Sequence, residues 1–150
     1  MNAKSSYRES SVRGANPVRL VIILYEQAIE DLRCAVLALE RGDIEARTRQ
    51  INHALLVIAQ LQSSLDMERG GEVARSLARF YGALRTGLAE AQQKQSAALL
   101  EQQISQLAEV HEAWLEVERA TAILAPAASN PSSSALPVSP AASSSAGWSA

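Results

Sequence analysis

The residues that could support catalysis or metal binding are few, and their spacing supports neither. His53 and His111 are the only two histidines of the chain. A di-metal site in a helical bundle needs a glutamate three residues before each histidine, but Gln50 and Ala108 hold those places. The sequence also lacks a His-Glu-x-x-His motif and a phosphate-binding Walker loop. We therefore expect no metal, no cofactor and no catalytic residue, in a protein that is not an enzyme.

Three further chemical features have simple structural interpretations. Gly70-Gly71 precedes a helical pattern without the Lys and Ser/Thr of a phosphate loop, so it is interpreted as a turn that uses glycine's backbone freedom. Cys34 is the single cysteine, which excludes an internal disulfide and fits the cytosol. His111 falls within an apolar stripe and should be a half-buried, hydrogen-bonded side chain. A solvated face of the first helix is expected to carry Glu26, Glu30, Asp31 and Arg33.

Charge and hydropathy narrow the functional classes. The net charge of −2 over 150 residues gives no bulk attraction to nucleic acid or anionic lipid. The longest apolar run, residues 20–25, is far shorter than the roughly 20 residues of a membrane-spanning helix. The polar N-terminus shows no secretory signal. We expect a cytoplasmic protein with no membrane span and no nucleic-acid partner.

The chain has no proline between Pro17 and Pro126, and its apolar residues recur at helical spacing. Three breaks divide the pattern into helices expected at about residues 17–41, 44–65, 72–94 and 97 to 118 or 120. The caps and turn residues expected to begin and end these helices are Asn16, Gly42, Asp43, Gly70-Gly71 and Ser96. This pattern predicts an all-α, antiparallel up-down four-helix bundle over residues 16–120.

The two ends of the chain differ from the bundle in composition. Residues 1–15 are polar, and we expect them to form a mobile N-terminal segment. Residues 121–150 carry no charge, and 22 of those 30 residues are Ala, Ser or Pro. Such a segment cannot bury enough apolar surface to offset its ordering entropy, so we expect a disordered tail.

The first two helices carry more apolar surface than one core needs. In the second and third helices the expected core stripes include Ile44 and Val73. The apolar arc of the first helix spans roughly 160°, wider than the ~100° of a core-facing helix. The surplus can pack under the N-terminal segment, be scattered exposure, or form a groove for a partner helix. The residues we expect to contact a partner, because the core stripes do not need them, are Leu20, Ile22, Ile23, Leu56 and Val57.

The order of several short motifs resembles the flagellar secretion chaperone (FliS) family. The most specific part is a set of motifs: Leu65-Asp66, then Glu68 with Gly70-Gly71-Glu72, together with Leu24-Tyr25 upstream, Phe80-Tyr81 downstream and Ala113-Trp114 near the end. Phe80 departs from the usual Leu, and the tail lies outside the resemblance. The matching stretches are Tyr7, residues 15–20, 24–29, 51–54, 61–66, 68–74, 77–81 and Ala113-Trp114, which together cover about residues 7–117.

The resemblance implies a cytoplasmic chaperone that holds the disordered C-terminal region of flagellin and prevents premature polymerisation. It also implies delivery to the flagellar type III export apparatus, with the export gate as a further partner. The client becomes partly helical as it wraps the bundle. Tyr7 matches the aromatic residue of an N-terminal strap that covers the client groove. Tyr25, Tyr81 and Asp66 match family positions, for which structural roles remain open.

Two alternatives stay open beside the resemblance. One is a metal-binding bundle or bundle enzyme, which the missing Glu-x-x-His pairs oppose. The other is a structural homodimer that buries the wide apolar face of the first helix against a second copy. The chaperone interpretation expects a monomer or weak homodimer when no client is bound.

Overall fold

The computed structural model describes residues 16–129 of the chain and the side chains of residues 16–122. By its internal contacts the chain divides into two units, Met1–Trp114 and Leu115–Ala150. The four described helices are α2 (Pro17–Glu40), α3 (Ile44–Ser63), α4 (Gly71–Lys94) and α5 (Ala97–Ser129). The predicted strap with Tyr7 and the last part of the predicted tail lie outside the described residues.

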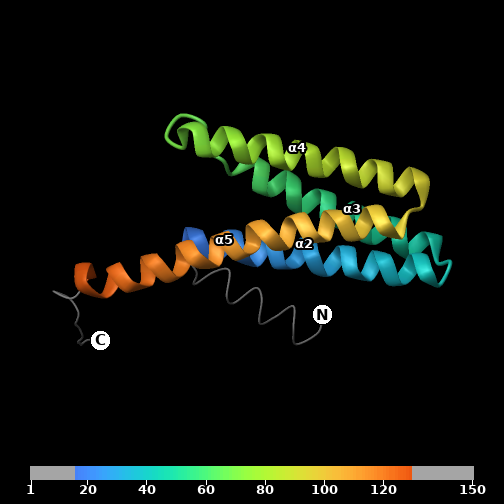
Figure 1. Cartoon of the computed structure of the whole chain (residues 1–150), viewed down its shortest axis with the longest axis horizontal. Coiled ribbons are helices and arrows are strands. Elements are labelled where there is room, and N and C mark those ends of the chain that lie inside the picture. The colour runs from blue at the N-terminus through green and yellow to red at the C-terminus, as the bar shows by residue number, and fades with distance from the viewer. Residues whose placement is uncertain (1–15, 130–150) are drawn as a thin grey trace, which may run out of the picture. The chain divides into compact units, whose positions relative to one another are not determined.

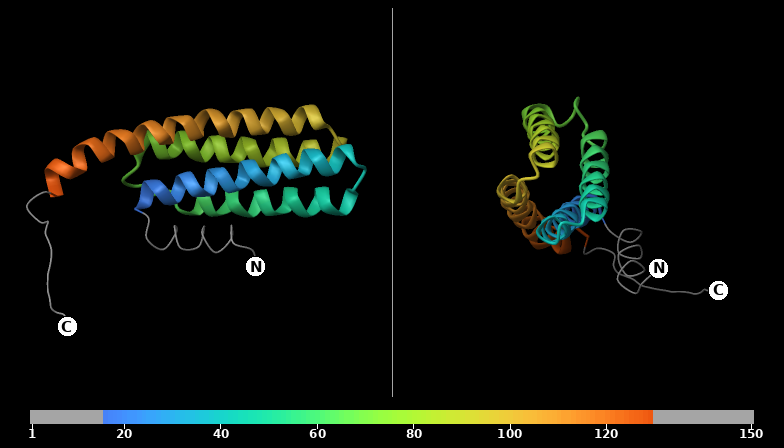
Figure 2. Two further views of the ribbon diagram at one scale, coloured as in Figure 1. Left: turned by 90° about the horizontal axis from the view of Figure 1, so that it is seen from below. Right: turned by 90° about the vertical axis from the view of Figure 1, so that its right-hand side faces the viewer.

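Up to Trp114 the helices form an antiparallel bundle (Figure 1). Each short connection reverses the chain, and the helices follow one another around the bundle in the order α2, α3, α4 and α5 (Figure 2). The prediction of an all-α, up-down four-helix bundle is confirmed. None of the helices within residues 16–129 is long and apolar enough to cross a membrane.

The helix starts are capped as the sequence predicts. The Oδ1 atom of Asn16 accepts a hydrogen bond from the backbone N–H of Arg19 at 2.8 Å, and Pro17 takes the first helical position of α2. Asp43 caps α3 in the same way. Ser96 accepts from a backbone N–H of the first turn of α5. Each cap satisfies one of the backbone N–H groups that a helix start leaves without a partner.

The turn after α2 shows why glycine is needed there. Gly42 has a φ of 74°, and its N–H donates to the carbonyl of Leu39. The N–H of Asp43 reaches back to the carbonyl of Ala38 at 2.8 Å, which completes the paired bonds of a Schellman motif. The turn after α4 uses the same bonds, but Gln95 occupies its left-handed position, with a φ of 51°.

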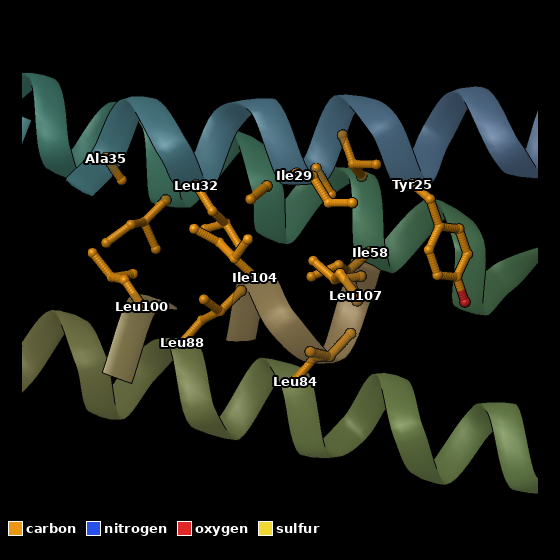
Figure 3. Close-up of a cluster of buried hydrophobic side chains, with 14 of the residues drawn as sticks. Tyr25, Ile29, Leu32, Ala35, Ile58, Leu84, Leu88, Leu100, Ile104 and Leu107 are labelled. Atoms are coloured by element: carbon orange, nitrogen blue, oxygen red, sulfur yellow. The ribbon is translucent and has the colours of Figure 1, made fainter. Parts of the chain in front are cut away.

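The core lies between all four helices (Figure 3). Its side chains are mostly leucine, isoleucine and alanine, and full burial of one leucine contributes about 1.5–3 kcal/mol. The bundle therefore draws its stability from this shared cluster rather than from any single helix. The labelled members are Tyr25, Ile29, Leu32 and Ala35 of α2, Ile58 of α3, Leu84 and Leu88 of α4, and Leu100, Ile104 and Leu107 of α5.

The structure corrects two expectations about the helices. The fourth helix does not end near Glu118 or Ala120, because α5 continues to Ser129. Alanine, the strongest helix former, holds five of the ten positions from 120 to 129. Ile44 and Val73 are not core residues, since their side chains are exposed. Both residues lie in the first turn of their helices.

Candidate partner-binding surface

A shallow, open surface region of about 890 Å³ lies along one side of α3, and we call it the α3 groove. Leu56, 68% exposed, and Ile44, 61% exposed, supply its apolar surface. The two residues are twelve positions apart, which separates them by about 18 Å along a helix axis. The described residues that line the groove all belong to α3 and are Ile44, Glu45, Thr48, Arg49, Asn52, His53 and Leu56.

His53, in the polar part of this groove, is fixed by a buried carboxylate of α2. Its Nδ1 atom lies 2.5 Å from Oδ2 of Asp31, and the Nε2 atom of Gln27 donates to Oδ1 of Asp31 at 2.8 Å. Asp31 is only 4% exposed, so the expectation that it belongs to a solvated face is wrong. A buried carboxylate needs such partners to offset its desolvation. Because Nδ1 faces Asp31, Nε2 remains for solvent or a bound partner.

The structure separates the residues that the sequence offered as partner contacts. Leu56 is exposed in the α3 groove, and Leu20 is partly buried near the start of α2. Tyr7 lies outside the described residues. Three others, Ile22, Ile23 and Val57, are buried. The reason for choosing those three, that the core does not need them, is therefore wrong, and their contact with a partner remains an untested prediction.

The burial of these residues follows from the place of α2 in the bundle. Figure 2 shows α2 with α3 on one side and α5 on the other. Glu26 of α2 confirms the second contact, because its Oε2 atom lies 3.1 Å from Nε2 of His111 in α5. The 160° arc of the first helix is thus largely used by the fold itself. The pair also confirms the expected hydrogen-bonded, partly buried His111.

Tyr25 of α2 and Tyr81 of α4 meet inside the bundle. Their hydroxyl oxygens are 2.8 Å apart, and both residues are buried. Burial raises the pKa of Tyr25, and its contacts with Tyr81 and Trp114 lower it in part. Burial and the neighbouring Tyr25 raise the pKa of Tyr81. Both hydroxyls therefore stay protonated and share one hydrogen bond, which indicates a structural role for the two residues.

A second, smaller cavity of about 190 Å³ lies at the end of the bundle where α2 and α4 begin and α3 ends. We call it the bundle-end pocket. Most of its wall is apolar, and Tyr81 contributes to it. The complete set of described lining residues is Val21, Leu61, Ser64, Leu65, Asp66, Gly70, Val73, Ala74, Leu77, Tyr81 and Trp114.

Asp66 shapes the loop beside this pocket. Its Oδ1 atom accepts hydrogen bonds from the backbone N–H groups of Glu68 at 3.1 Å and Arg69 at 3.0 Å. This is the turn-capping role that the sequence left open for Asp66. Among the described residues, no group of three His, Cys, Asp or Glu side chains gathers closely enough to hold a metal ion.

The family model for the flagellar protein FliS matches residues 1–121. The chain belongs to this family. The match takes in all of α2, α3 and α4 and ends within α5. The sequence resemblance is therefore confirmed. Residues 122–150 lie beyond the match.

Curated relatives agree with the family assignment. The flagellar secretion chaperone FliSB of Pseudomonas aeruginosa is 36% identical over 118 residues, which cover 76% of this chain and 94% of the relative. The flagellar secretion chaperone FliS of Salmonella typhimurium is 33% identical over 110 residues, covering 73% of this chain and 82% of the relative. The FliS chaperone of Bacillus subtilis is 26% identical over 113 residues, which are 75% of this chain and 84% of the relative.

Proposed function

We propose that this chain is a cytoplasmic, non-enzymatic export chaperone for flagellin. It binds the disordered C-terminal region of flagellin, prevents premature polymerisation and supports delivery to the flagellar type III export apparatus. The family match over residues 1–121 carries this proposal. The relatives named flagellar secretion chaperones support it.

The α3 groove offers the client a surface that the bundle does not use. An amphipathic helix that crosses α3 obliquely would cover Ile44 and Leu56, which lie about 18 Å apart along the axis of α3 and about 120° apart around it. Its polar atoms would meet the side chains between them, including the Asp31-bound ring of His53. Covering the client's apolar face in this way competes with filament assembly, which needs the same face.

Ordering a disordered client has a free-energy cost that takes up most or all of what this one groove can supply. Ordering such a segment costs about 2–5 kcal/mol of the gross interaction energy. Full burial of one leucine or isoleucine side chain contributes about 1.5–3 kcal/mol. Because Leu56 and Ile44 are about two-thirds exposed, covering both of them can contribute at most about 2–4 kcal/mol to client binding. We therefore infer that the client contacts further parts of the bundle as well. Leu20, which is partly buried, is the remaining candidate from the sequence among the described residues.

The test is calorimetric titration of the full chain with a flagellin C-terminal segment, with a flagellin N-terminal segment of equal length as the control. We expect one segment bound per chain, a negative heat-capacity change and a gain of helical circular dichroism on mixing. Tyr7→Ala should tighten binding, because a strap that covers the groove competes with the client.

Two outcomes would contradict the proposal. One is the absence of binding by the C-terminal segment at micromolar concentration. The other is a stable homodimer in sedimentation that persists unchanged when the segment is added, since that result favours the structural homodimer.

A further inference from the structure

The bundle-end pocket has the volume of one large side chain. It measures about 190 Å³. A dry protein cavity of about 150 Å³ lined by Leu, Ile and Phe accommodates benzene. The pocket can therefore take a phenyl ring or a leucine or methionine side chain, but it cannot take a helix.

Among the described lining residues, Tyr81, Ser64 and Asp66 already have hydrogen-bond partners for their polar side chains. Tyr81, on its wall, already shares its hydroxyl with Tyr25. The Oγ atom of Ser64 donates to the carbonyl of Leu61 at 2.8 Å. The Oδ1 atom of Asp66 holds two backbone N–H groups. A polar occupant would lose its own hydrogen bonds to water without replacement, so the interior selects an apolar one.

Asp66 is the one charged side chain among the described residues that line the pocket. Its carboxylate lies 3.8 Å from the guanidinium group of Arg69, which balances its charge. The most exposed apolar side chain of the lining is Val73, 68% exposed.

The mouth is shaped by a tight backbone approach rather than by long side chains. The N–H of Gly70 donates to the carbonyl of Asp66 at 2.7 Å. A Cβ atom on Gly70 would lie 2.6 Å from Cβ of Ala74 and 2.7 Å from the carbonyl oxygen of Asp66. The pocket is thus formed before any ligand arrives, which reduces the entropic cost of binding.

From this geometry we propose that the bundle-end pocket binds one leucine, methionine or phenylalanine side chain of the flagellin segment. The inference rests on the proposed function, and it gives the client a second binding site that is separate from the α3 groove. Several stretches that carry the family resemblance converge on this pocket, namely residues 61–66, 70–74 and 77–81 together with Trp114.

Benzene serves as a probe for the pocket on its own. We expect benzene to shift the methyl resonances of Leu65 and Leu77 in a saturable way in the wild-type chain. Adding the flagellin C-terminal segment should displace it. Val21→Trp places an indole ring in the pocket and should abolish the benzene response. Val110→Trp is the matched control, because Val110 is also a partly buried valine but does not line the pocket.

The two variants then test the client. Val21→Trp should weaken binding of the segment at least tenfold, the equivalent of burying one large apolar side chain. Val110→Trp should stay within twofold of the wild type. If Val21→Trp does not fold, the benzene competition on the wild-type chain decides alone.

Several results would overturn the inference. If the segment binds but leaves benzene in place, or binds folded Val21→Trp as tightly as the wild type, the pocket is not an anchor and the proposed function still stands. If benzene gives no saturable shift, the pocket is not the preformed apolar site described above. If the wild-type chain does not bind the segment at all, the inference and the proposed function both fail.

Discussion

Two glycines of α4 give a matched test of how tightly α4 and α5 pack. A glycine in a helix interior costs about 0.5–1 kcal/mol relative to alanine. A Cβ atom at Gly82 would meet nothing within 4 Å. Gly82→Ala should therefore raise the free energy of unfolding by about 0.5–1 kcal/mol.

Gly87 should show the opposite sign for the same change. A Cβ atom there would lie 2.4 Å from Nε2 and 2.6 Å from Cδ of Gln103, whose side chain is buried. Gln103 is only 5% exposed, and its Oε1 atom has no hydrogen-bond partner among the described residues, so the amide has little free space to move into. Overpacking costs about 1–3 kcal/mol, which exceeds the gain in helix propensity. We expect Gly87→Ala to lower the free energy of unfolding by up to about 2 kcal/mol.

Urea unfolding followed by far-ultraviolet circular dichroism measures both variants against the wild type. The midpoints should move in opposite directions while the slopes stay equal, because the buried area hardly changes. If Gly87→Ala stabilises the chain as much as Gly82→Ala, Gln103 does not lie against the Gly87 backbone, and the described packing of α5 on α4 is wrong.

Three further predictions concern the bundle interior and its turns. The raised pKa values of Tyr25 and Tyr81 mean that the folded chain keeps both protons after the unfolded chain has lost them, so stability should fall as the pH rises above about 10. Tyr81→Phe should lower the free energy of unfolding by about 1 kcal/mol at neutral pH. In urea titrations at increasing pH, this variant should lose less stability above about pH 10 than the wild type. An equally steep loss in the variant would contradict the prediction. Gln95→Gly removes the strain of a non-glycine residue in the left-handed conformation, which costs about 1–2 kcal/mol. The greater backbone entropy that glycine loses on folding offsets part of this gain, but the melting temperature should still rise. An unchanged or lower melting temperature would contradict the described turn. Gly70→Ala should destabilise by about 1–3 kcal/mol in the same melting assay, and a neutral effect would show that the loop has room for a Cβ atom.

The fold could be predicted because its signals are local. Asn16, Asp43 and Ser96 act on backbone groups within the next turn of the chain, so their types and spacing suffice to place the helix starts. The left-handed Gln95 could not be foreseen, since the direct connection to α5, rather than residue preference, requires that conformation.

The candidate site was harder to predict because it depends on which helices lie side by side. A helical wheel shows that α2 has a wide apolar arc, but not that α3 and α5 together cover it. Asp31 looks like a surface charge in the sequence, and only the approach of His53 explains its burial. Ile44 was missed because periodicity ignores helix ends, although its place directly after the Asp43 cap was a usable signal.

The most direct test of the central claim, that the α3 groove binds the flagellin segment, compares Leu56→Asp with Leu37→Asp. Leu37 is 53% exposed on α2 and does not line the groove. Both variants should keep melting temperatures close to the wild type, since neither side chain is buried. Titration with the flagellin C-terminal segment should show at least a tenfold loss of affinity for Leu56→Asp and little loss for Leu37→Asp. Equal affinities for the two variants would contradict the account.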